Sequence, residues 1–420
     1  GEMDGSSWEQ ALDVAGFRKL LSGSVDLSKS TIYMSQGKYV MSEESGLGVI
    51  VRKNVKAIKG GYSQFSEGTD VSARDIDTYV TVISGDVNGN KQADAGDCGL
   101  LLVKKGHITI EGVTFQYGYV SEADASTTEC GSGIYVSGGA GDTSIELTDC
   151  VIRDCTSGVT TSAKQGGPAV FVLSGQVRLN NVNLLDNTAV GRGGAVRCNS
   201  KTAVVFMNGC LLKGNSHNGS WGNGIQMSEG HICINNTTLI DNMGTGAALN
   251  GGGSILLTNN TIIGNTSDSH GAVRCETGVG GDTKFINNLL LSENPSAPSF
   301  NLNGSNFEAF SKGYNVYQRV TGITMSASDT AYPNPVNGTL DEKGVYVWDL
   351  NQIGSVKGYA TKQAVIEVAK SFNPVASPIA NLGEVFVEWV GEDAFGIDQR
   401  EVTRNANKMQ AGAYDAVLTN

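Results

Sequence analysis

The sequence predicts an all-β protein built as a parallel β-helix, in which the chain coils and stacks short strands rung on rung. Three observations carry this prediction: a strand-like apolar pattern that recurs along the middle of the chain, a spacing of about 29 residues between recurrences, and a further short strand after each one. The 3.6-residue period of helices is missing from this region, which excludes a helical solenoid.

The repeating unit alternates apolar and polar positions, breaks at a polar pair, and ends on an Asn slot. Its clearest copies are "VRLNNVNLLDN" (177–187), "VVFMNGCLLKGN" (204–215), "ICINNTTLIDN" (232–242), "ILLTNNTIIGN" (255–265) and "KFINNLLLSEN" (284–294). Two earlier copies, "ITIEGVTFQYG" (108–118) and "IELTDCVIRDC" (145–155), carry Gly118 and Cys155 in the slot. Period-two apolar positions mark strands, and the polar pair marks the break between two of them. Stacked Asn side chains in the slot are expected to hydrogen-bond along the axis.

A third strand follows each slot after a variable loop and begins with small residues. These strands are "GSGIYV" (131–136), "GPAVFV" (167–172), "GGAVRC" (193–198), "GNGIQM" (222–227), "GAALN" (246–250) and "HGAVRC" (270–275). Three short strands per turn, with no helix between them, describe one coil of a parallel β-helix.

The two ends are expected to cap the coils, because a solenoid end exposes an unpaired rung. We predict an N-terminal cap over residues 1–30, coils over 31–318, and a C-terminal cap over 319–420 that packs on the last coils within one continuous domain. The N-terminal cap contains a predicted helix over 7–21 with a Ser N-cap. In the C-terminal cap the pattern predicts a helix over 360–372 and strands over 345–350 and 383–390.

The chain resembles secreted and surface-displayed repeat proteins of Gram-negative bacteria. Its pairs "LLDN" with "GGAV", "LLKGN" with "GNGI" and "IIGN" with "HGAV" are similar to the repeats of polymorphic outer-membrane proteins. The wider chain looks like the choice-of-anchor β-helix proteins, whose N-terminal motifs are matched by "SSWEQAL", "TIYMSQGKYV" and "TVISGDVNGN", and whose C-terminal motifs by "SKGYNVY", "GIDQR" and "AGAYD". The resemblance implies a right-handed coil of the pectin-lyase-like superfamily, exported or displayed at the outer-membrane surface, with its signal or anchor outside this sequence. It does not imply an enzyme.

Composition and charge narrow the classes of partner. The net charge is −12, with 30 Lys and Arg against 42 Asp and Glu. This argues against nucleic acid, whose phosphates need a basic surface, and it disfavours a strongly acidic polysaccharide. No apolar run is long enough for a transmembrane helix.

The outward side of the third strands is the predicted ligand-binding face. If Val196 and Cys198 point into the coil, Arg197 points out, since strand side chains alternate between the two faces. The outward column in this register is Tyr135, Phe171, Arg197, Gln226, Leu249 and Arg274, with Trp221 in a neighbouring loop. Its arginines and aromatic rings could stack on and hydrogen-bond to sugars or a protein partner, and the alternative is an ordinary solvated face.

One stretch, "DVNGNKQADAGD" (86–97), has the oxygen-ligand spacing of a calcium loop. The candidate ligands are Asp86, Asn88, Asn90, Asp94 and Asp97. Lys91 stands where such a loop needs Gly, and no flanking helices are predicted. Both interpretations, a Ca²⁺ site and a plain polar loop, stay open.

No catalytic constellation emerges from the remaining candidates. The histidines His107, His217, His231 and His270 have no carboxylate at a useful spacing, and Asp149 with Asp154 fit turn positions. The cysteines fill core slots, although Cys130 and Cys155 could pair across neighbouring coils. The motifs of pectate lyases and polygalacturonases are missing, so the prediction leans away from an enzyme.

The sequence therefore predicts a non-enzymatic, secreted or cell-surface β-helix that binds glycans or protein partners through its outer faces and loops. The alternatives are a carbohydrate-active enzyme, a lyase or hydrolase, acting in a surface cleft, and a structural stalk.

Overall fold

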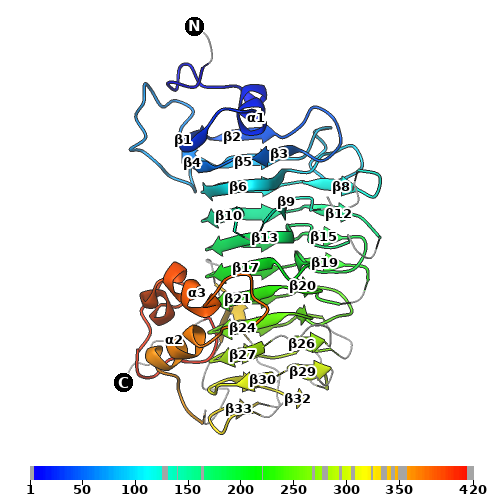
Figure 1. The fold of residues 1–420 in the computed structure, drawn as a ribbon, viewed down its shortest axis with the longest axis vertical. Helices are drawn as coiled ribbons and strands as arrows, with labels where there is room; N and C mark the ends of the chain where they lie inside the picture. Colours follow the sequence, from blue (N-terminus) through cyan, green and yellow to red (C-terminus); the bar gives the residue numbers. More distant parts are fainter. Residues whose placement is uncertain are drawn as a thin grey trace.

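The computed structural model describes residues 4–124, 131–139, 141–161, 165–219, 221–266, 270–276, 282–292, 296–303, 308–322, 325–332, 338–341, 346–348 and 357–413. Within them the chain forms the predicted parallel β-helix, since each coil pairs in parallel with the coils before and after it (Figure 1). The predicted all-β fold class is confirmed.

The strands of successive coils stack into four sheets that run along the coil axis. Sheet 1 contains β1 (Leu27–Ser35), β4 (Val55–Tyr62), β6 (Leu101–Glu111), β10 (Thr143–Thr148), β13 (Val170–Asn180), β17 (Ala203–Asn208), β21 (His231–Asn235), β24 (Ser254–Thr258), β27 (Asp282–Ile286) and β30 (Glu308–Ser311). Sheet 2 contains β2 (Gly37–Val40), β5 (Thr81–Ser84), β7 (Val113–Gln116), β11 (Val151–Arg153), β14 (Asn183–Leu185), β18 (Leu211–Lys213), β22 (Thr238–Ile240), β25 (Thr261–Ile263), β28 (Leu289–Leu290), β31 (Val316–Tyr317) and β33 (Thr330–Ala331).

The other two sheets complete each coil. Sheet 3 is short and contains β8 (Tyr119–Ser121), β12 (Thr156–Gly158), β15 (Thr188–Ala189) and β19 (Ser216–His217). Sheet 4 holds the third strands of the predicted repeat: β3 (Val49–Arg52), β9 (Ile134–Ser137), β16 (Val196–Cys198), β20 (Ile225–Met227), β23 (Leu249–Gly251), β26 (Val273–Glu276), β29 (Phe300–Asn303) and β32 (Val320–Thr321). Strands β6 and β13 turn the corner from sheet 4 into sheet 1.

Inside the coils, equivalent side chains stack on one another. In sheet 1 the inward column runs through Ile145, Val177, Val205, Ile232 and Ile255, all fully buried and paired across successive strands. One contiguous apolar core fills the coil along its length. Each buried aliphatic side chain contributes about 1.5–3 kcal/mol, so the stacked columns supply most of the stability.

The predicted Asn slot forms a buried hydrogen-bonded ladder. The amide of Asn187 donates to Asn215 (2.9 Å), Asn215 donates to Asn242 (2.8 Å), and Asn242 donates to Asn265 (2.8 Å). Each amide also donates to a backbone carbonyl of the preceding coil, as Asn215 does to Leu184 (2.9 Å). The ladder satisfies polar groups that would otherwise be buried without partners.

The helix in the N-terminal cap begins later than predicted. The helix over the first rung is α1 (Val14–Ser22), capped by Asp13, whose carboxylate accepts from the Gly16 amide at 2.7 Å. Phe17 and Leu21 are its buried residues. The predicted Ser cap is wrong because an aspartate closer to the apolar face meets the same N-cap requirement.

The C-terminal segment lies alongside the coils. The predicted helix over 360–372 is confirmed as α2 (Lys362–Lys370), and the strand over 345–350 as β35 (Tyr346–Trp348), which pairs with β34 (Gly338–Leu340). The strand predicted over 383–390 is wrong: this stretch forms helix α3 (Leu382–Val390), followed by the 3₁₀ helix η2 (Glu392–Gly396). Its valines and aromatics favour a strand locally, but Leu382, Phe386 and Val387 pack as one helical face on the coils, and packing overrides that preference.

Helices α2 and α3 cover the outer side of sheet 1 over its later coils (Figure 1). Together with η2 and the residues up to 413 they are called the cap segment below. It packs on the side of the coils rather than over their end. No helix among the described residues is long and apolar enough to cross a membrane.

Candidate functional site

The predicted column on sheet 4 is a true structural column with one register error. Tyr135, Phe171, Arg197 and Gln226 are direct partners across β9, β13, β16 and β20. The next partners are Asn250 and then Arg274. The prediction placed Leu249 in this column, which is wrong: Leu249 pairs with Ile225 and Val273 and lies in the core.

This column is buried beneath the loops that follow sheet 3. Tyr135 and Phe171 are 0% and 1% exposed, lie 5.7 Å apart between ring centres, and pack in one cluster with Val120 of β8 and with Val159, which follows β12. Arg197 is 5% exposed. A ligand cannot reach Tyr135, Phe171 or Arg197 without displacing the loops, so this part of the sheet 4 face is not an open surface.

The polar members of the column bind within the protein. The Arg197 guanidinium lies over the Phe171 ring at 5.7 Å and donates to the Gln165 carbonyl and to Asn199 (3.0 Å). Gln226 accepts from the Gly222 amide at 2.8 Å. These contacts give both side chains a structural role.

The last two predicted ligand-binding residues lie near the edge of this region. Arg274 is partly exposed on β26. Trp221 is also partly exposed, has a left-handed backbone (φ +99°), and lies under the Arg192 guanidinium at 5.8 Å. Trp221 belongs to a loop and not to the column, so the predicted residues do not form one binding surface.

The predicted calcium loop closes on itself through its own side chains. Asp97 is fully buried and accepts from the amides of Val87 (2.9 Å) and Asp94 (3.1 Å). Asp86 forms an ion pair with Lys38 at 3.1 Å.

The middle of this loop is held in the same way. The Asp94 carboxylate accepts hydrogen bonds from the side-chain amides of Asn88 (3.0 Å) and Asn90 (2.5 Å). Lys91 takes the left-handed conformation (φ +62°) at the position where a calcium loop has Gly. Among the described residues no cluster of three or more His, Cys, Asp and Glu is arranged to hold a metal.

The seven thiols in the described part of the chain do not supply a reactive group. The seven cysteines in the described ranges are free and buried, Cys155 among them, while Cys130 lies outside the described residues. Burial raises the pKa of Cys150, Cys155, Cys198 and Cys210 to about 12, which keeps them protonated and inert.

Sequence reasoning missed the outer side of sheet 1 over its earlier coils, which is open. Strands β4, β6, β10 and β13 here alternate inward apolar and outward polar residues. We call this surface the open face. Its outward side chains are Lys59, His107, Thr109, Glu111, Ser144, Glu146 and Arg178, whereas Gln176 in the same register is buried.

The centre of the open face is a cluster of three charges. The Glu111 carboxylate pairs with Lys59 at 2.9 Å and with Arg74 at 3.5 Å. Arg74 comes from the loop over 63–80 and is held by a hydrogen bond from its Nε to the Gly60 carbonyl (2.8 Å). Gly112 (φ +64°) lets this loop lie flat, because a Cβ there would sit 2.4 Å from the Ile76 side chain and 2.6 Å from the Arg74 guanidinium.

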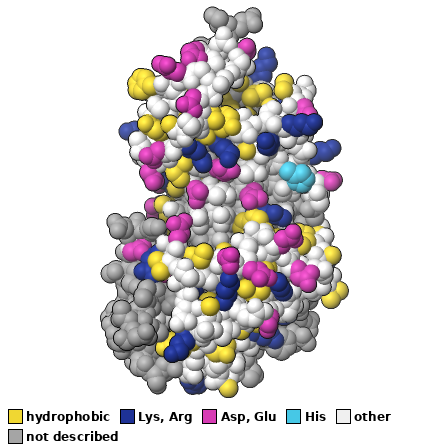
Figure 2. Space-filling view, turned by 90° about the vertical axis from the view of Figure 1, so that its left-hand side faces the viewer, with side chains coloured by type: hydrophobic (Ala, Val, Ile, Leu, Met, Phe, Trp, Pro, Cys, Tyr) yellow, Lys and Arg dark blue, Asp and Glu magenta, His cyan; other side chains and the backbone are white. Residues whose placement is uncertain are grey.

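Polar pairs and aromatic rings extend the open face in both directions. The His107 ring nitrogen Nδ1 and the Ser144 hydroxyl are 2.8 Å apart on neighbouring strands. Towards the N-terminus, Tyr62 packs against Tyr33 (5.4 Å) and Trp8 (5.6 Å), and Tyr33 is 40% exposed. Basic and acidic side chains are interspersed over this half of the molecule (Figure 2).

Helix α3 borders the open face at its other end. The Trp389 indole donates to Glu146 at 3.0 Å, and the Arg178 guanidinium lies over the rings of Phe206 (5.7 Å) and Trp389 (6.0 Å). Beyond this border the outward residues of sheet 1 become apolar and are covered by the cap segment.

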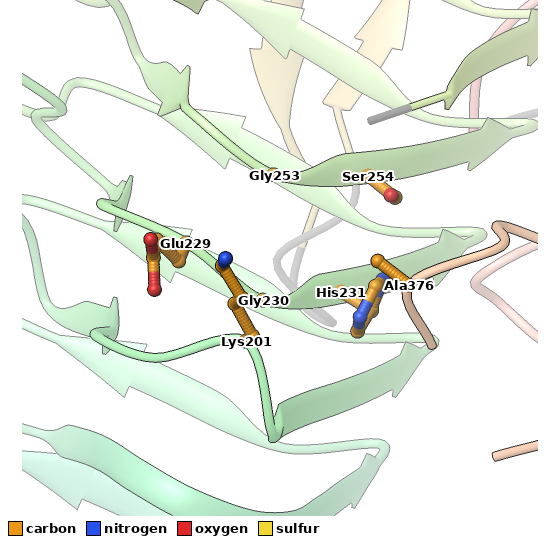
Figure 3. A pocket seen from close by; sticks show the side chains of 7 residues that line it. All are labelled: Lys201, Glu229, Gly230, His231, Gly253, Ser254 and Ala376. Carbon is orange, nitrogen blue, oxygen red and sulfur yellow. The ribbon is translucent and has the colours of Figure 1, made fainter. Parts of the chain in front are cut away.

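A small pocket lies farther along, where the cap segment meets the coils. It is shallow, opens to solvent, and is lined by Lys201, Glu229, Gly230, His231, Gly253, Ser254 and Ala376. The His231 ring lies beside Ala376, with Lys201 and Glu229 to one side (Figure 3).

His231 is 3% exposed, and neither ring nitrogen has a hydrogen-bond partner among the described residues. The backbone around Ala376 and Lys201 lies close to the ring without reaching hydrogen-bond geometry. Burial lowers the pKa of His231. The contact between the cap segment and the coils at this pocket therefore favours the neutral form of the His231 imidazole.

The comparisons with known proteins agree with the fold. A family model described as a right-handed beta helix region matches residues 77–290, just over half of the chain. No curated protein and no solved structure matches this chain.

Proposed function

This chain belongs to the right-handed β-helix family, and we propose that it is a non-enzymatic binding protein whose open face takes an extended glycan chain. The observation that carries the proposal is the contrast among the outer surfaces. The loops cover the sheet 4 column and the cap segment covers the later part of sheet 1, while the open face keeps polar side chains at the surface.

The chemistry of the open face supports a glycan. Sugars offer hydroxyl groups that both donate and accept, and they are matched by Lys59, Arg74, Glu111 and the His107–Ser144 pair. The exposed Tyr33 ring, at the end of the face, supplies an apolar surface with a polar edge on which a sugar ring can stack.

The state of the two carboxylates supports binding over catalysis. Glu111 is held between two cations, and Glu146 is held by the Trp389 indole. A general acid–base pair needs one carboxyl poised to give a proton and another poised to take one. As part of the proposal the protein acts outside the cell, secreted or at the cell surface, which its resemblance to displayed repeat proteins supports.

A glycan array followed by calorimetry on the best ligand tests the proposal. We expect Arg74→Ala with Tyr33→Ala to weaken binding about tenfold, since each exposed contact contributes up to about 1 kcal/mol. Lys213→Ala, which removes an outward lysine of sheet 2, serves as the control and should leave affinity unchanged.

Two results would overturn the proposal. Failure to bind any glycan would favour a protein partner or a structural stalk. Release of reducing ends or unsaturated products from a bound polysaccharide would establish the enzyme alternative.

A further inference from the structure

A ridge of positive charge borders the open face at the corner between sheets 4 and 1. It consists of Lys29, Arg52, Lys56 and Lys105, which we call the basic ridge, and His107 lies beside them. All five side chains are exposed, and they come from β1, β3, β4 and β6, which are neighbouring strands. Such a cluster is unexpected in a chain whose net charge is −12.

The pairing register places two of these cations directly opposite each other. Arg52 and Lys105 are partners in the β3–β6 ladder, at the spacing of about 4.8 Å between strands. Like charges directly opposite on a sheet are destabilising. The neighbouring Lys104 is also affected by the positive charge of Arg52. Burial lowers the pKa of its ammonium group, and the nearby Arg52 charge lowers it further.

No ion pair within the described residues neutralises the ridge. Within the described residues none of Lys29, Arg52, Lys56 and Lys105 lies within 4 Å of a carboxylate. Lys53, next to them in the chain, instead donates to the backbone carbonyls of Gly23 (2.9 Å) and Val25 (3.0 Å) after helix α1. Lys53 therefore has a structural role, and the ridge has none that the described contacts supply.

The ridge follows the coil axis rather than a single strand. Lys29 lies opposite the stretch that holds Lys56, and the next strand brings Lys105 and His107. Hydroxyl groups of Ser28, Ser30 and Ser144 lie on or beside the same strands. Cations at successive rungs, with hydroxyls between them, suit a ligand that repeats its negative charge along an extended chain.

We infer that the basic ridge selects an acidic glycan, one whose sugars carry sulfate, carboxylate or phosphate groups, as the ligand of the open face. The inference rests on the proposed function, because it names the chemical class bound at that site. It also revises the expectation that the net charge disfavours an acidic polysaccharide. Although acidic residues are in excess over the whole chain, the positive side chains at this corner create a local field that attracts an anionic ligand.

The test compares oligosaccharides of matched length that are sulfated, uronic-acid-based, phosphorylated or neutral, each titrated into the full chain at several salt concentrations. We expect at least one acidic series to bind more tightly than the neutral one, and its affinity to fall as salt rises. The three acidic arms identify the source of the charge.

The variant Lys56→Gln with Lys105→Gln should weaken acidic-glycan binding about tenfold and flatten the salt dependence, while leaving neutral-glycan binding unchanged. The charge-matched control is Lys201→Gln with Lys213→Gln, two lysines outside the ridge, which should change neither. The ridge variant should also unfold at an equal or higher temperature than the parent, because it relieves the Arg52–Lys105 repulsion.

The outcomes separate the two proposals. Tight neutral-glycan binding without an acidic preference, or acidic binding that the ridge variant leaves intact, would overturn the inference and keep the proposed function. A lower unfolding temperature for the ridge variant would assign the ridge to stability and overturn the inference too. No binding to any series would overturn both.

Discussion

The outer side of sheet 1 has two halves that share one backbone and one register but differ in what covers them. One outward column runs from Thr109 through Glu146 and Arg178 to Phe206 and on to Cys233 and Leu256. Before Phe206 the column is polar and open, and from Phe206 onward it is apolar and lies under α2 and α3. The same coil geometry thus yields a binding surface in one half and a second core in the other, and only the outward residues decide which.

The largest expected effect comes from the covered half. Phe206 is fully buried and meets the Phe386 ring at 5.2 Å, so Phe206→Ala leaves a cavity between the coils and the cap segment. We expect a loss of about 3–5 kcal/mol in the free energy of unfolding, measured by denaturant titration, with earlier proteolysis of the cap segment. Thr109→Ala, in the same column of the open half, is the control and should cost less than about 0.5 kcal/mol. Equal losses would show that the two halves do not differ in this way.

The next effect is a dependence of cap-segment docking on pH. Because burial lowers the pKa of His231 below its ordinary value of 6.5, the folded protein binds this proton less well than the unfolded chain does. The stability contributed by the neutral ring is complete above that value and is lost as the pH falls below it. We expect proteolysis of the cap segment to accelerate on acidification from about pH 8 to about pH 5.

His231→Gln should remove most of that acceleration. The matched control is His217→Gln, because burial also lowers the pKa of His217, which bonds to Asn223 (3.0 Å) inside the coil and away from the cap segment. If proteolysis of the cap segment depended on pH as strongly in the His231→Gln variant as in the parent, protonation of His231 beside Ala376 would not be the cause.

The smallest effect is expected in the open half. Glu111→Gln breaks two partly exposed ion pairs, with Lys59 and Arg74, and should lower the free energy of unfolding by only about 0.2–1 kcal/mol. Glu111→Gln should change the free energy of glycan binding by more than it changes the free energy of unfolding. A variant that loses several kcal/mol of stability while binding normally would reverse the assignment of this cluster.

The coil could be predicted from the sequence because its signal is repeated. The repeated apolar positions and the Asn slot identify the side chains that point into the coil. In the structure the apolar positions form the core columns and the Asn slot forms the ladder. The slip at Leu249 shows where this fails: "GAALN" has small apolar residues on both sides of the strand, so alternation alone does not fix its register.

Tyr135 and Phe171 are buried by loops such as the one that contains Val159. The alternation of residues in the strands does not show where these loops run, so this burial could not be predicted. A signal for the two halves of sheet 1 was nevertheless present. "HITIEG" and "SIELTD" alternate apolar and polar residues, whereas "AVVFMN" and "SILLTN" are apolar on both sides. Strands buried on both faces have that second pattern. It predicts a cover over the later coils, although the identity of α3 follows only from the tertiary contact with Phe206.

The Asn ladder has a consequence for how this architecture can change in length. Each rung of the ladder is completed by the coil before it and the coil after it, so whole coils can be gained or lost without leaving an amide unmatched. The cap segment, by contrast, spans a fixed stretch of coils between Phe206 and Ile286. Coils added before β10 would leave the cap contacts untouched, including the hydrogen bond from Trp389 to Glu146, and would lengthen the open face. Duplication in that half is therefore a route by which descendants of this chain can recognise longer ligands while keeping the same stability.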